Sequence, residues 1–143
     1  MSLTFTVYGT PGPQGSKKYM GQSGKGRAIL KEVSGKVKPW RAAVVEATVD
    51  PLRPALDGPL SVRMVFTLKK PSAAPKRTRT WPCKTPDLSK LARSTEDALT
   101  DAGVWADDAR VVEYARLAKV FPGEDPEALH VPGVRIQIDQ VVE

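Results

Sequence analysis

Three aspartates stand where their carboxylates could do chemistry. Asp87 lies in the stretch TPDLSKLARSTED (residues 85–97), directly after a proline and at the start of a helical pattern. Asp107 and Asp108 are adjacent, and neighbouring carboxylates repel each other unless a cation lies between them. Mg²⁺ takes oxygen ligands and is commonly held by one or two carboxylates together with phosphate oxygens of a substrate. The three side chains are therefore candidate ligands of a divalent cation.

Asp87 also has a structural interpretation. At the start of a helix its side chain can accept from free backbone N–H groups, which contributes about 1 kcal/mol. Apolar residues at helical spacing over residues 88–99 form one stripe, and Gly103 follows where a left-handed C-terminal cap is expected. If the next strand runs antiparallel to this helix, Asp87 lies about 22 Å from the aspartate pair. A complete site then needs a strand that crosses back or a second subunit.

The elements that must hold these residues follow from periodicity. Alternating apolar residues predict strands over residues 3–8 and 60–68, and two further strands are expected over 111–121 and 134–141. Helical spacing predicts a first helix over 39–49, before the second one that carries Asp87. The order β-α-β-α-β-β predicts an α+β (mixed α/β) fold. We expect one small domain, residues 1–143, with a mixed sheet of about four strands packed with two main helices.

Positive charge is concentrated in two segments. The chain has 143 residues and a formal net charge of +6. Residues 1–41 contain Glu32 as their one acid and residues 61–93 contain only Asp87, whereas acids outnumber bases in residues 94–143. Stretches 11–35 and 69–85 are predicted to be basic, mobile loops. Such a chain is suited to hold a polyanion and to present carboxylates to it, although solvated surface loops can have the same composition.

Other classes of protein are disfavoured by composition. No apolar run approaches the ~20 residues of a membrane-spanning helix, and the first residues lack the pattern of a signal peptide. The single cysteine, Cys83, excludes an intramolecular disulfide and a cysteine-rich zinc site, and we expect it to serve in packing. We therefore expect a cytoplasmic protein with no membrane partner and no small-molecule cofactor.

Over nearly its whole length the sequence resembles the RusA-type Holliday junction resolvases, including their phage and prophage relatives. The stretch YGTPGPQGSKK is similar to that family's G-x-P-x-PQGS-K opening. After Trp40, the stretch TPDLSKLARSTEDALTDAGVWADDARVV is similar to its KPDLDKL…DAL…G-x-DD-x-x-V core, and PGVRIQI closes the resemblance. The resemblance implies a homodimeric endonuclease of recombination and repair that cuts four-way DNA junctions. It implies Mg²⁺ as cofactor, with Mn²⁺ as a substitute, and a bacterial or phage-infected cell.

The resemblance also implies roles for individual residues. The family's metal ligands fall on Asp87, Asp107 and Asp108, and its catalytic positions on Asp87, Arg93 and Asp108. The residues expected to bind DNA phosphates, with strongly salt-dependent affinity, are Lys17, Lys18, Lys76, Arg77, Arg79 and Lys90.

Two positions depart from the family pattern. Ser89 stands where the family has a second aspartate, so a bound ion loses one anionic ligand. Arg93 stands where the family has a catalytic lysine; it keeps a positive charge for a phosphate but cannot exchange a proton. Glu96 is either a replacement carboxylate, although it lies about 10 Å along the helix from Ser89, or an ion-pair partner of Arg93.

These departures leave three functions open. The first is Mg²⁺-dependent resolution of four-way junctions. The second is a junction-binding protein whose cutting is weakened or lost because of Ser89. The third is a nuclease that prefers flaps or replication forks.

Overall fold

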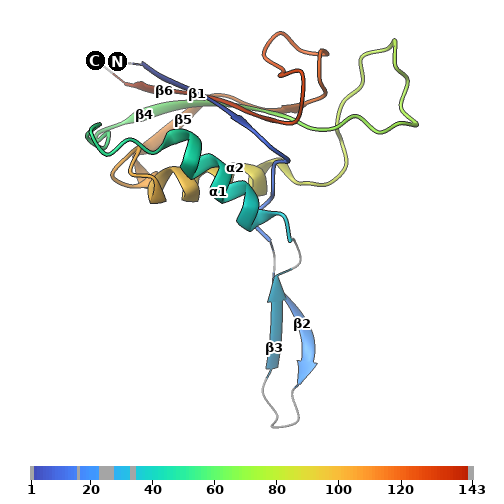
Figure 1. Ribbon diagram of the computed structural model, residues 1–143, viewed down its shortest axis with the longest axis horizontal. Helices are drawn as coiled ribbons and strands as arrows, with labels where there is room; N and C mark the ends of the chain where they lie inside the picture. The colour runs from blue at the N-terminus through green and yellow to red at the C-terminus, as the bar shows by residue number, and fades with distance from the viewer. Residues whose placement is uncertain (1, 16, 23–27, 33–34, 142–143) are drawn as a thin grey trace.

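A four-stranded mixed sheet lies over two helices in the computed structural model, which describes residues 2–15, 17–22, 28–32 and 35–141 (Figure 1). The strand order across the sheet is β1–β6–β4–β5, with β4 and β5 parallel and the other neighbours antiparallel. This arrangement confirms the predicted fold class, and the four strands of this sheet and the two helices follow the predicted order along the chain. The bounds are β1 Ser2–Tyr8, β4 Leu60–Thr67, β5 Val111–Val120, β6 Gly133–Gln140, α1 Val37–Thr48 and α2 Leu88–Asp101.

A two-stranded antiparallel hairpin differs from the prediction of a loop over residues 11–35. Strands β2 (Lys17–Gln22) and β3 (Ala28–Glu32) pair with each other, and the hairpin lies apart from the four-stranded sheet in Figure 1. The density of glycine and the short apolar runs of this segment hid the strands from a periodicity argument. The second predicted loop, residues 69–85, contains no helix or strand.

Strand β4 supplies much of the core. Its alternating residues Leu60, Val62, Met64 and Phe66 are fully buried, as the sequence predicts for one face of the sheet. The last part of β4 is buried on both faces, because the connection between β5 and β6 covers the side away from the core cluster. In that cover the Leu129 amide donates to Thr67 Oγ1 at 2.8 Å.

Two buried tryptophans fix helix α2 in the core. Trp40 on α1 donates from Nε1 to Thr95 Oγ1 at 3.1 Å, and Thr95 donates to the Leu91 carbonyl at 2.8 Å. Trp105 donates from Nε1 to Thr100 Oγ1 at 2.8 Å. The indole N–H groups are thus satisfied inside the protein, as buried polar groups must be. A threonine on the apolar stripe of α2 therefore has a structural function.

The C-terminus of α2 is closed by the glycine that the sequence singles out. Gly103 has φ +74°, and its amide donates to the Thr100 carbonyl at 3.0 Å. The Val104 amide donates to the Leu99 carbonyl at 3.0 Å, which completes a Schellman motif. This turn directs the chain into the link that carries Asp107 and Asp108.

We expect Gly103→Ala to lower the free energy of unfolding by about 1 kcal/mol, because an L side chain is strained in the left-handed region. Urea titration followed by circular dichroism measures the change. The matched control is Gly35→Ala, where φ is not in the left-handed region and a new Cβ meets open space. Equal stability of the two variants would contradict the assigned role of the turn.

Candidate functional site

Asp87 occupies the N-cap position of α2, but its side chain makes no capping hydrogen bond. Its backbone carbonyl accepts from the amides of Lys90 and Leu91 at 3.1 Å each. The carboxylate is 54% exposed and lies 3.7 Å from Lys90 Nζ. The prediction that this side chain caps the helix is therefore wrong, and the carboxylate is open to other ligands.

The segment just before Asp87 is held by a lysine from the far end of β5. Lys119 Nζ donates to the carbonyls of Lys84 at 2.7 Å and Pro86 at 2.8 Å. The Thr85–Pro86 peptide bond between them is cis. Because the end of β5 lies beside the start of α2, strand and helix run antiparallel, which is the arrangement that separates Asp87 from the aspartate pair.

The other end of α2 faces the start of β5. Tyr114 on β5 donates its hydroxyl to Glu96 Oε2. Burial raises the pKa of Glu96 above its ordinary value, and burial together with the Glu96 contact raises the pKa of Tyr114. The direct partner of Glu96 is thus Tyr114, and the charge of Arg93 acts on it only weakly. An isolated tyrosine on a strand gave no signal from which this contact could be predicted.

Asp107 and Asp108 are adjacent, and both carboxyl groups are exposed. Asp107 precedes the short 3₁₀ helix η1 (Asp108–Arg110) and accepts from the Ala109 amide at 3.3 Å. A hydrogen bond between the two carboxyl groups lowers the pKa of Asp107 and raises that of Asp108. The charge of Asp97 on α2 raises the pKa of Asp108 further. Negative charge therefore accumulates where α2, η1 and β5 meet.

The structure does not bring Asp87 and the aspartate pair together in one chain. Within the described ranges no group of three or more His, Cys, Asp or Glu residues has an arrangement that could hold a metal ion. Ser89 and Arg93 are exposed along α2, between the two sets of carboxylates. The donor set of Asp107 and Asp108 suits Mg²⁺, which two carboxylates and substrate oxygens can hold, and within one chain Asp87 does not belong to that set.

The proline- and glycine-rich opening motif packs onto α2. The Gln14 amide donates to the Lys90 carbonyl at 2.9 Å, and Ser94 Oγ donates to the Gly12 carbonyl at 2.6 Å. A Cβ on Gly12 would lie 2.3 Å from the Lys36 carbonyl oxygen, so this close approach requires glycine. The motif therefore supports the helix that carries Asp87 and Arg93.

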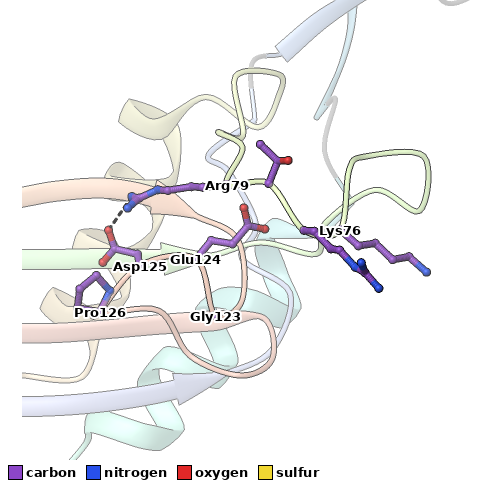
Figure 2. A pocket seen from close by; sticks show the side chains of 8 residues that line it. Lys76, Arg79, Gly123, Glu124, Asp125 and Pro126 are labelled. Carbon is purple, nitrogen blue, oxygen red and sulfur yellow. Dashed lines mark hydrogen bonds and ion pairs between the residues drawn. The ribbon is translucent and has the colours of Figure 1, made fainter.

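The predicted DNA-binding residues of the second basic segment line an open cleft of about 580 Å³. Figure 2 shows Arg79 reaching Asp125, with Nη2 3.1 Å from Oδ2, while Lys76 extends away from that pair. No carboxylate of the described chain lies within ion-pair distance of Lys76 or Arg77. These two cations are therefore available to an anion, whereas the charge of Arg79 is largely matched by Asp125.

The cleft joins the 69–85 segment to the connection between β5 and β6. Lys70 Nζ lies 2.7 Å from Glu124 Oε2, and the Thr80 amide donates to Glu124 Oε1 at 2.7 Å. Arg116 on β5 donates to both oxygens of Asp125. These long-range ion pairs were not predictable from either segment alone.

The other predicted DNA-binding residues of the first basic segment, Lys17 and Lys18, lie on β2, where side chains are outside the described part of the structure.

Comparison with protein families gives a match over most of the chain. The model of endodeoxyribonuclease RusA matches residues 9–139. A search of curated proteins found no match. No helix in the described ranges is both long and apolar enough to cross a bilayer.

Proposed function

Because this chain belongs to the RusA family of endodeoxyribonucleases, we propose that it resolves four-way DNA junctions by Mg²⁺-dependent hydrolysis of phosphodiester bonds. The observation that supports metal dependence best is the pair of adjacent, exposed aspartates Asp107 and Asp108. A divalent cation stabilises adjacent carboxylates. Membership of an endodeoxyribonuclease family indicates that the substrate is a DNA phosphodiester.

The residues of the site have separate functions in this proposal. Asp107 and Asp108 hold Mg²⁺, which when bound acidifies water and neutralises charge on the phosphoryl group. Arg93 binds the scissile or a neighbouring phosphate, since its exposed guanidinium can donate two parallel hydrogen bonds. Lys76 and Arg77 bind backbone phosphates of a junction arm.

The separation of Asp87 from the aspartate pair supports a dimer. In one chain these carboxylates lie beside opposite ends of α2, so in this proposal Asp87 of a second subunit completes the ligand set. A two-fold symmetric dimer would form two such sites, which matches a junction that must be cut in two strands.

Cleavage of four-way, three-way and linear DNA, side by side and with or without Mg²⁺, tests the proposal. We expect Mg²⁺-dependent cutting of the four-way junction at a rate well above that of the linear duplex. Preferred cutting of forks or flaps would change the assigned substrate, and equal cutting of linear DNA would contradict junction selectivity.

A second candidate function is favoured by Ser89, whose hydroxyl adds no negative charge beside Asp87 on α2. In this case the protein binds junctions without cutting them. Binding in EDTA with no cutting at any Mg²⁺ or Mn²⁺ concentration would support it. Ser89→Asp should then restore cutting, because it adds an anionic ligand two residues after Asp87.

A further inference from the structure

One tryptophan of the chain is exposed beside the basic cleft. Trp81 is 59% exposed, whereas Trp40 and Trp105 are 1% exposed each. The Arg79 guanidinium lies 4.0 Å from the centre of the Trp81 ring, a cation–π contact. Arg79 is itself fixed by Asp125, whose side chain is 3% exposed. The exposed Trp81 ring is therefore held in place by Arg79, which is itself held by Asp125.

Trp81 borders an apolar cavity of about 390 Å³, distinct from the cleft of Figure 2. This volume lies in the range of pockets that hold small organic groups. The wall contains two lysines, Lys69 and Lys84, and no carboxylate. It extends to Pro86, the residue before Asp87. The apolar part of the wall comes mainly from Leu68, Pro71, Ala73, Ala74, Trp81, Pro82 and Phe121.

We propose that this cavity, with Trp81 as its stacking surface, takes one unstacked nucleobase of the branched DNA. The inference rests on the proposed function and deepens it, because it assigns a base-binding subsite next to Asp87. Every base presents a π-face, so an aromatic surface binds bases with little sequence preference. Bases at a branch point have already lost part of their stacking, which lowers the cost of turning one out.

Charge favours DNA over a protein segment as the occupant. Lys69 and Lys84 can contact the phosphates on either side of a base that enters the cavity, as the phosphate backbone dominates DNA affinity. Lys76 and Arg77 continue the positive surface along the same segment. A largely apolar cavity whose only charged lining residues are two lysines is complementary to a nucleobase carried on a polyanion.

Junction binding by Trp81 variants in EDTA, where cutting is suppressed, tests the inference. We expect Trp81→Ala to raise the Kd for a four-way junction about fivefold or more, and Trp81→Phe to raise it less, since a phenyl ring still stacks. The slope of log K against log salt should stay unchanged, because no phosphate contact is lost. Junction binding should also shield the fluorescence of the wild-type protein from acrylamide, since Trp81 is its exposed tryptophan.

The matched control is Tyr8→Ala, which removes another exposed aromatic side chain, on β1, and should leave the Kd unchanged. If the Kd of Trp81→Ala for the junction is within twofold of the wild-type value, the base-binding inference is overturned, while the proposed function is unaffected. A reduced salt slope would also overturn it, because Trp81 would then act only through the phosphate contacts of its segment. The inference would also be overturned if the wild type sediments as a dimer without DNA and Trp81→Ala as a monomer, since the cavity would then be a contact between subunits. Failure of the wild type to bind junctions would overturn the proposed function as well.

Discussion

Asp108→Asn should reduce junction cutting by about 100-fold or more while leaving junction binding intact. The change replaces one of two adjacent carboxylates by a neutral amide of the same shape, so a bound cation loses an anionic ligand. Binding in EDTA should be equal or slightly tighter, because the substitution removes a negative charge from the DNA-binding surface. The measurements are single-turnover cleavage of a labelled four-way junction and a binding titration without metal.

The fold should tolerate Asp108→Asn, which makes the loss of cutting interpretable. Asp108 is exposed, and its side-chain contact is with another carboxyl group, that of Asp107, so no stabilising ion pair is lost. Asp50→Asn is the matched control: this exposed aspartate lies 3.9 Å from Arg53 just after α1 and should cut like the wild type. Undiminished cutting by Asp108→Asn would remove the aspartate pair from the site.

Much of the fold was predictable because its signals are local. The alternation of β4 predicts the face that the core buries, and Gly103 marks the end of α2 through a conformation that other residues avoid. The antiparallel course of α2 and β5, and hence the separation of Asp87 from the pair, was one of two alternatives that element lengths allowed. Lys119 at one end and Tyr114 at the other show that the antiparallel alternative holds.

The remaining features depend on contacts between distant segments. Asp87 has a capping residue type and position, yet its carboxylate makes no capping bond. Cys83 was expected to serve in packing but is exposed, because residues 69–85 are held at the surface by ion pairs. Those ion pairs join residues far apart in the sequence, for example Arg79 and Asp125, which are 46 residues apart. Counting charged residues in the sequence identifies the cations of such a network, but it does not show which of them form ion pairs with carboxylates of the same chain.

Asp125→Asn should lower the free energy of unfolding by about 2–3 kcal/mol, the largest stability effect we expect from a single charged residue. Asp125 accepts from Arg116 at 2.7 and 2.9 Å, from Arg79 at 3.1 Å and from the Glu127 amide at 2.9 Å. An asparagine would turn an NH₂ group toward these donors and leave two arginines without their shared anion. Loss of one partner from a buried ion pair costs about 3–5 kcal/mol, and the partial exposure of both arginines reduces this figure.

Thermal and urea unfolding measure the effect, with an expected fall in Tm of roughly 5–10 °C. Asp101→Asn is the matched control, because its contact with Arg41 at 2.8 Å lies at the surface and should contribute below about 1 kcal/mol. A loss of stability no greater than that of the control would show that the network does not hold residues 69–85 in place.

The stability difference between wild type and Asp125→Asn should also depend on pH. The Arg116 guanidinium holds the pKa of Asp125 well below its ordinary value. A carboxyl group with a lowered pKa in the folded state stabilises it fully above the pKa of the unfolded chain, about 3.9. As pH falls below that value the unfolded chain takes up a proton first, and the wild type loses stability that the variant never had. The gap in unfolding free energy should therefore be constant from pH 7 to 5 and narrow below pH about 4. A gap that does not narrow would mean that Asp125 stabilises the fold through its shape and not through its charge.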